Sequence, residues 1–250
     1  AFYIMEFKQG RVLWDQGLPG MANPQRAAIY DEMNRVIAAL HTVDVQQHGL
    51  SDYGKSGNYF ERQIGRWSKQ YQASITQPIE EMDLLMDWLP AHMPDSARDE
   101  RKRSIVHGDY RIDNLMFAPE EDRVVAVLDW ELSTLGHPLA DFSYHCMAWH
   151  IPASLGRGIG GLDIAALGIP SEQDYMRSYC ERTGLATPEQ LQADWNFYLA
   201  YNMFRIAAIL QGIAKRVEAG TASSAQAKAA GETARPMAQL AWAYAQKHSA

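Results

Sequence analysis

His107–Asn114, which reads HGDYRIDN, and Leu128–Glu131, which reads LDWE, are the two short stretches on which the fold of this chain depends. Between Asn114 and Asp129 lie two apolar runs, Leu115–Phe117 and Val124–Leu128, and a polar turn segment at Pro119–Asp122 separates the two runs. Two short apolar runs on either side of a turn segment predict a strand, a turn and a second strand. The sequence therefore predicts a small β-hairpin at the centre of the chain.

The predicted hairpin brings chemically useful side chains to one place. Because a hairpin returns the chain to its starting point, we expect Asn114 and Asp129 to lie side by side, with Asp109 on the loop just before the first strand. An aspartate can meet the proton of a hydroxyl group, and an amide and a carboxylate oxygen are ligands that suit Mg²⁺. This combination is typical of phosphoryl transfer, in which Asp109 is the catalytic candidate and Asn114 and Asp129 are the metal ligands.

The pattern HGDxxxxN followed by DW resembles the catalytic and metal-binding loops of the aminoglycoside phosphotransferase/choline kinase superfamily, which has a protein-kinase-like fold. Longer segments resemble the kinase-like domains that are fused to acyl-CoA dehydrogenases, together with their free-standing bacterial relatives. These segments are Glu61–Tyr71, Leu128–Asp141 and Phe204–Gly212. The resemblance runs over nearly the whole chain. It is specific for the subgroup and says little about the substrate.

The resemblance implies an α+β fold, namely the mostly helical large lobe of a kinase-like protein with small β-hairpins and with the small lobe largely absent. Residues 1–10 would be the last small-lobe strand and the hinge, and residues 11–250 the large lobe. Met5, Glu6 and Phe7 would be the hinge residues that meet the adenine edge. The implied cofactors are ATP and Mg²⁺, and the implied reaction is phosphorylation of a small-molecule hydroxyl, with a hydroxyacyl or acyl-CoA-type metabolite as the acceptor.

Four further residues are candidates for supporting roles. His107 is a general base in one interpretation, but we favour a structural role in which its ring binds the backbone of the loop. Arg111 either steadies phosphate charge or pairs with a carboxylate such as Asp113 or Asp141. Asp141 is expected to anchor its own helix to the catalytic loop. Glu131 is either a group behind the metal ligands or a surface carboxylate.

Composition excludes several classes of function. The formal net charge is −7 and no cluster of Lys and Arg is present, so we expect no nucleic-acid partner. The 250 residues contain two cysteines without metal-binding spacing, which favours a reducing, cytoplasmic compartment. The most apolar predicted helix, Trp195–Ile213, carries Arg205 in its middle, so we expect a core helix and no membrane partner.

Helical spacing dominates the remainder of the chain. An Asn cap followed by proline predicts a helix start at Asn23, and a second helix carries apolar residues from Phe60 to Ile75 on one face. Further helices are predicted to begin near Pro78, at His137, after Ser171 and after Thr187, and an Ala-rich helix is predicted from Ser223 to His248 with a bend at Gly231 and Pro236.

An aromatic stripe runs through these helices and bears on the acceptor. It comprises Tyr59, Trp67, Tyr71, Trp195, Tyr198 and Tyr201. Such residues are more often core than ligand-binding, but any that line a pocket would favour an apolar or acyl-bearing acceptor. Two alternatives stay open. One is an aminoglycoside-type antibiotic kinase, which would need clustered carboxylates, and the other is a non-catalytic pseudokinase or binding module. A fused or associated acyl-CoA dehydrogenase is a further possible partner.

Overall fold

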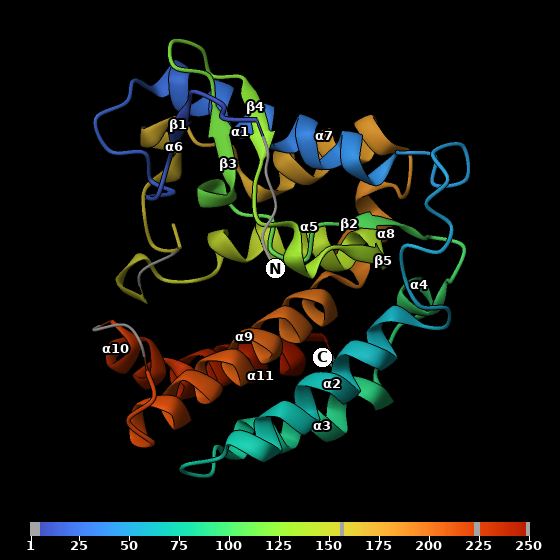
Figure 1. Ribbon diagram of the computed structural model, residues 1–250, viewed down its shortest axis with the longest axis vertical. Coiled ribbons are helices and arrows are strands. Elements are labelled where there is room, and N and C mark those ends of the chain that lie inside the picture. Colours follow the sequence, from blue (N-terminus) through green and yellow to red (C-terminus); the bar gives the residue numbers. More distant parts are fainter. Residues whose placement is uncertain (1–5, 156–157, 223–225, 249–250) are drawn as a thin grey trace. The chain divides into compact units, whose positions relative to one another are not determined.

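A computed structural model describes residues 6–155, 158–222 and 226–248, and the chain divides into two compact units (Figure 1). Unit 1 contains residues 1–53, 104–135 and 148–188, and unit 2 contains residues 54–103, 136–147 and 189–250. Both units are thus assembled from segments that lie far apart in the sequence.

Unit 1 is built around a three-stranded antiparallel sheet with the strand order β1–β3–β4. Its strands are β1 (Arg11–Val12), β3 (Leu115–Phe117) and β4 (Val124–Val127). The β3–β4 pair confirms the predicted hairpin, with Leu115 opposite Val127 and an irregular register between Met116 and Phe117. A second, two-stranded sheet joins β2 (Ser104–Val106) to β5 (Thr134–Gly136). The loop that carries Asp109 follows β2 directly, so both sheets determine its position.

One helix of unit 1, α1 (Asn23–His41), contacts β4 of the sheet (Figure 1). Two further helices, α6 (Ile164–Leu167) and α7 (Glu172–Thr183), pack against α1. Asn23 was expected to cap α1, but Ala22 occupies the cap position and makes no side-chain cap bond. The Asn23 amide instead donates to the carbonyl of Ala166, 2.8 Å away, and so ties α1 to α6. The predicted cap at Ser171 is confirmed, since its side chain accepts from the backbone N–H of Asp174.

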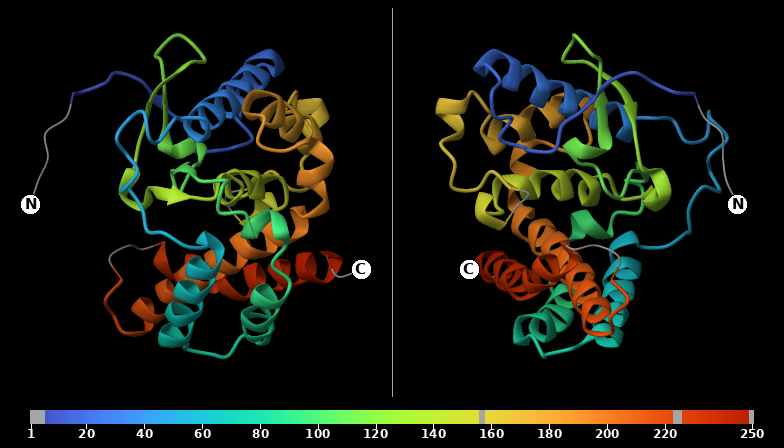
Figure 2. Two further views of the ribbon diagram at one scale, coloured as in Figure 1. Left: turned by 90° about the vertical axis from the view of Figure 1, so that its right-hand side faces the viewer. Right: turned by 60° about the vertical axis from the view of Figure 1, so that its left-hand side comes forward.

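Unit 2 is a bundle of helices around the long helix α9 (Trp195–Glu218). The other helices are α2 (Tyr59–Ser74), α3 (Glu80–Ala91), α4 (Asp95–Arg98), α5 (Pro138–Cys146), α10 (Ala227–Glu232) and α11 (Ala234–His248). Helices α2, α5, α10 and α11 all pack on α9, and α11 runs beside it for much of its length, as Figures 1 and 2 show. Helix α8 (Pro188–Ala193) links this bundle to unit 1 in the sequence.

Two helix predictions for unit 2 need correction. Ile75 was placed on the buried face of the second helix, but it follows the last helical residue of α2 and is 37% exposed. The Ala-rich C-terminal stretch is not one bent helix. It is broken at Thr233 into α10 and α11, and Gly231 allows α10 to approach α9 so closely that a Cβ there would lie 2.9 Å from Cα of Ala214.

The fold as a whole agrees with the predicted α+β class, with a mostly helical lobe and small sheets. Within the described part of the chain, no helix combines the length and the apolar character that a membrane crossing requires.

Candidate active site

His107 connects the loop before the hairpin to the hairpin itself. Its ring is completely buried, and Nδ1 accepts the backbone N–H of Asp109 at 3.2 Å. Nε2 lies 2.7 Å from the carbonyl of Leu128, so this nitrogen carries the proton and donates it. Both ring nitrogens therefore have backbone partners. This is the set of contacts that the structural interpretation of His107 requires.

Gly108 allows the loop to pass the chain that follows β4. Its φ is +83°, in the left-handed region, and a Cβ at this position would lie 2.8 Å from the carbonyl oxygen of Leu132. Only glycine combines this backbone conformation with so close an approach. Gly108 and His107 together place the backbone of Asp109 relative to the segment that carries Asp129.

Two side chains of its own loop hold the Asp109 carboxylate. The Asn114 amide donates to Oδ2 of Asp109 at 3.1 Å and to its backbone carbonyl at 2.8 Å. The Arg111 guanidinium forms an ion pair with Oδ1 at 3.2 Å and a second ion pair with Asp113, also at 3.2 Å. Of the two partners suggested for Arg111, Asp113 is therefore found beside it. Asp141 lies in unit 2, where it is buried in the first turn of α5.

Asn114 and Asp129 flank the base of the hairpin. Asn114 ends a short 3₁₀ turn (Ile112–Asn114), and its carbonyl accepts the N–H of Leu128, the residue before Asp129, at 2.8 Å. Asp129 has φ 65° and ψ 57°, which is left-handed, and it precedes a second 3₁₀ turn (Trp130–Leu132). The turn reverses the chain immediately after β4 and leaves Asp129 and Glu131 exposed.

Three carboxylates share this site with one guanidinium. Burial raises the pKa of Asp113 above its ordinary value, while Arg111 opposes the rise, and the nearby charges of Asp109 and Asp129 add to it. Asp129 is therefore close enough to interact with the Asp109–Arg111–Asp113 group. Because Arg111 offsets only part of this negative charge, the site is electrostatically suited to a cation.

The donor set fits a hard divalent cation such as Mg²⁺. In the described residues, no group of three or more His, Cys, Asp or Glu side chains could hold a metal ion by itself. Asn114 and Asp129 would contribute two oxygen ligands. Mg²⁺ sites in enzymes that use nucleotides commonly take the remaining ligands from phosphates and water.

The hinge prediction falls partly outside the described residues, because Met5 is not among them. Glu6 and Phe7 are exposed, and Glu6 forms an ion pair with Lys8 at 2.7 Å. Their role toward adenine stays a prediction.

Sequence reasoning missed the contacts that support the hairpin from the start of the chain. Arg11 in β1 donates to the carbonyls of Ala118 and Glu121 and pairs with Asp122. Glu32 in α1 accepts the N–H of Val124 at 2.9 Å. Lone charged residues in a two-residue strand and in a helix give no signal for such long-range contacts.

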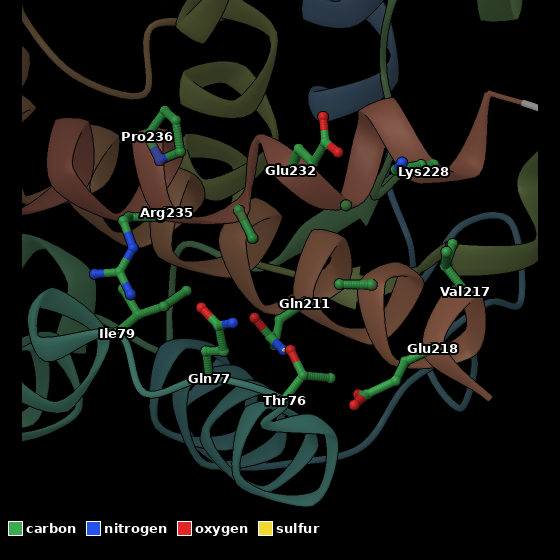
Figure 3. Close-up of a pocket in the computed structure, with 13 residues that line it drawn as sticks. Thr76, Gln77, Ile79, Gln211, Val217, Glu218, Lys228, Glu232, Arg235 and Pro236 are labelled. Carbon is green, nitrogen blue, oxygen red and sulfur yellow. The ribbon is translucent and has the colours of Figure 1, made fainter.

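Unit 2 contains a cavity of about 740 Å³ (Figure 3), bordered by α9, α10, α11 and the connection between α2 and α3. Gln211, Thr76 and Gln77 lie near its centre, and Arg235 and Lys228 lie toward opposite ends. The residues that line it include none of the catalytic and metal-binding candidates.

The fold and this loop are those of a kinase-like phosphotransferase. The chain belongs to the phosphotransferase enzyme family, whose profile matches residues 1–186. It is 66% identical to a protein from Ralstonia eutropha JMP134 that is provisionally described as an aminoglycoside phosphotransferase, with a TM-score of 0.92 over 98% of this chain and 73% of that one. A choline kinase from Cryptosporidium parvum Iowa II is 12% identical with a TM-score of 0.62, covers 98% of this chain and 69% of its own, and shares the fold.

Curated relatives confirm the predicted subgroup. The chain is 46% identical to acyl-CoA dehydrogenase family member 10 of Mus musculus, over 98% of this chain and 22% of that protein. It is 40% identical to the probable acyl-CoA dehydrogenase IBR3 of Arabidopsis thaliana, over 98% of this chain and 30% of that protein. The chain thus spans between a fifth and a third of the length of these relatives.

Proposed function

We propose that this chain transfers the γ-phosphoryl group of ATP, in an Mg²⁺-dependent reaction, to a hydroxyl group of a small molecule. The observation that carries the proposal is the grouping of Asp109, Asp113 and Asp129 around Arg111, with Asn114 bonded to Asp109. A phosphotransferase needs a carboxylate for the acceptor hydroxyl and oxygen ligands for the metal ion, and this loop supplies both.

In this proposal each residue has a distinct role. Asp109 accepts a hydrogen bond from the acceptor hydroxyl, orients it and takes its proton late in the transfer. Because phosphoryl transfer has a loose transition state, positioning of the hydroxyl matters more than the basicity of the carboxylate. Asn114 and Asp129 would hold Mg²⁺, which when bound neutralises charge on the phosphates. The ring of His107 hydrogen-bonds to the backbone of both Asp109 and Leu128 and so fixes the position of one relative to the other.

The acceptor that we favour is a hydroxyacyl or acyl-CoA-type metabolite. Support comes from the curated relatives, whose names describe acyl-CoA dehydrogenases, and from the aromatic core of unit 2. A fused or associated acyl-CoA dehydrogenase is part of the same proposal. An aminoglycoside acceptor is the second candidate, and it is favoured by the description of the Ralstonia protein.

The test is an ADP-release assay on the full-length gene product with ATP and Mg²⁺. Medium-chain hydroxy acids, their CoA thioesters and kanamycin would be compared as acceptors, with the Asp109→Asn variant as the control for background ATP hydrolysis. We expect turnover of the hydroxyacyl compounds that the control abolishes. Higher kcat/KM with kanamycin would replace the acceptor class and leave the kinase reaction standing. Absence of ADP release with every acceptor, in a protein that binds ATP, would support a pseudokinase.

A further inference from the structure

The carboxylate of Asp129 is placed by its backbone and not by a side-chain contact. Within the described residues it forms neither a hydrogen bond nor an ion pair, whereas the carboxylates of Asp109 and Asp113 are both paired with Arg111. Asp129 is exposed, and its backbone is left-handed, with φ 65° and ψ 57°. This conformation is unfavourable for a residue with a side chain, so neighbouring groups must hold it.

The next residue, Trp130, closes the turn around Asp129. Its indole N–H donates to the carbonyl of Val127, the last residue of β4, at 2.8 Å. The Trp130 carbonyl in turn accepts the N–H of Ser133 at 2.9 Å, which closes the following 3₁₀ turn. Because Asp129 lies between the two ends of the first bond, that bond opposes rotation of its backbone.

The ring of His107 fixes the adjoining peptide group. It donates to the carbonyl of Leu128 at 2.7 Å, one residue beyond the carbonyl that Trp130 binds. The two rings also pack on each other, with their centres 5.0 Å apart and their planes inclined by 58°. The two consecutive carbonyls before Asp129 are thus bonded by two side chains in mutual contact, and the peptide groups that lead into Asp129 have fixed orientations.

Trp130 is not a core residue, because 41% of its surface is exposed. Phenylalanine or leucine could cover the His107 ring as well, but neither has an N–H donor for the Val127 carbonyl. The feature that distinguishes tryptophan at this position is therefore its bond across the Asp129 turn.

We propose that Trp130 is a positioning residue for the metal site. Its indole N–H holds Asp129 in the left-handed conformation before Mg²⁺ and nucleotide bind, so the carboxylate is ordered on folding and loses less freedom on binding. This inference rests on the proposed function, in which Asp129 is a ligand of the ion, and it adds a residue that has no role in that function so far.

The test compares ATP binding by the full-length gene product, measured by calorimetry in MgCl₂ and in EDTA. Trp130→Phe keeps an aromatic ring and removes the N–H. We expect the affinity for ATP in MgCl₂ to fall about 3- to 10-fold, as for loss of a neutral hydrogen bond, and the affinity in EDTA to change less than twofold.

The matched control is Trp149→Phe. The Trp149 indole N–H also donates to a backbone carbonyl in unit 1, that of Pro170, at 3.0 Å. Both variants lose a bond of the same kind, so both should lower Tm. Only Trp130→Phe should reduce the contribution of Mg²⁺ to ATP affinity.

Hydrogen exchange without nucleotide or metal gives a second measurement. The Ser133 amide is bonded to the Trp130 carbonyl, so it reports opening of the turn that follows Asp129. Its exchange should become about 3- to 10-fold faster in Trp130→Phe and stay unchanged in Trp149→Phe. Unchanged exchange in Trp130→Phe would show that the indole bond does not hold the turn.

The results separate this inference from the proposed function. If Asp129→Asn loses Mg²⁺-dependent binding and Trp130→Phe keeps it in full, the positioning role is overturned and the metal assignment stands. If Asp129→Asn binds ATP in MgCl₂ like the natural protein, the metal assignment fails and the role of Trp130 fails with it. An equal loss of affinity in MgCl₂ and in EDTA would show that Trp130 supports only the fold.

Discussion

The side-chain amide of Asn114 donates to the carboxylate of Asp109 at 3.1 Å, so the residue expected to bind metal is bonded to the residue expected to meet the acceptor. The same amide also donates to the backbone carbonyl of Asp109 at 2.8 Å. When Asn114 turns its amide nitrogen to Asp109, its amide oxygen is directed elsewhere and can serve as a ligand. The Asn114 amide can therefore orient the carboxylate of Asp109 and contribute an oxygen to the metal site at the same time.

Asp109→Asn should lower kcat by roughly 10²- to 10⁴-fold, with little change in ATP affinity. The amide that replaces the carboxylate keeps the shape and still accepts the bond from Asn114, but it cannot take a proton and loses the ion pair with Arg111. Steady-state kinetics together with calorimetric titration of ATP would check this. An active variant with less than a twofold change in kcat would refute the catalytic role.

Asp129→Ala should abolish Mg²⁺-dependent nucleotide binding, because it removes an anionic ligand. The left-handed backbone of Asp129 provides a control. Asn tolerates that conformation and Ala does not, so Ala should cost about 1 kcal/mol more in unfolding free energy than Asn. We therefore expect both variants to lose Mg²⁺-dependent binding and only Ala to lose stability. Normal Mg²⁺-dependent ATP binding by Asp129→Asn would remove Asp129 from the metal site.

Gly108→Ala should destabilise the protein by about 2–4 kcal/mol, since it combines a left-handed backbone with a contact against the Leu132 carbonyl. Gly184 at the end of α7 is the matched control, because its φ is +63° and a Cβ there would meet nothing within 4 Å. Gly184→Ala should cost only about 1 kcal/mol. Chemical denaturation would measure both, and equal losses would show that the approach to Leu132 is not tight in solution.

Glu32 should make stability dependent on pH in the acid range. Burial alone would raise the pKa of Glu32, but hydrogen bonds from Arg35 and from the N–H of Val124 outweigh burial and hold the pKa below its ordinary value. A lowered folded-state pKa stabilises the protein above the unfolded value of about 4.3, and this contribution is lost as pH falls through the folded value.

Glu32→Gln should therefore be less stable than the natural protein at pH 7 by about 1 kcal/mol, because hydrogen bonds to a charged group are weakened but solvent screens part of their contribution. The difference should shrink as pH falls below about 4, where the natural carboxyl is also protonated. Urea denaturation at several pH values would measure it. A difference that stays constant with pH would mean that packing, and not charge, accounts for the loss.

The hairpin and the loop before it could be predicted because their signals are local. A polar turn between two apolar runs is enough to predict β3 and β4, and the spacing of Asp109 and Asn114 on one loop follows from the chain itself. The pairing of β1 with β3 could not be predicted, since a two-residue strand has no periodicity and its partner lies far along the sequence.

Errors in the helical part arose where tertiary contacts outweigh local preference. Asn23 is of a residue type that often caps helices, but its side-chain amide donates to the carbonyl of Ala166 in α6. The C-terminal Ala-rich stretch has helical propensity throughout and yet breaks at Thr233, where the tight approach of Gly231 to Ala214 fixes α10 on α9.

Leu128 has no side-chain chemistry to offer, yet its peptide groups join the two halves of the candidate active site. Its N–H binds the carbonyl of Asn114, and its carbonyl receives the ring N–H of His107. Substitutions at His107 and at Asn114 therefore both remove support from the backbone of Leu128. Their combined effect on the free energy of unfolding will differ from the sum of the single effects. We therefore expect paired substitutions within the segment from His107 to Leu132 to be tolerated differently from the same substitutions made singly.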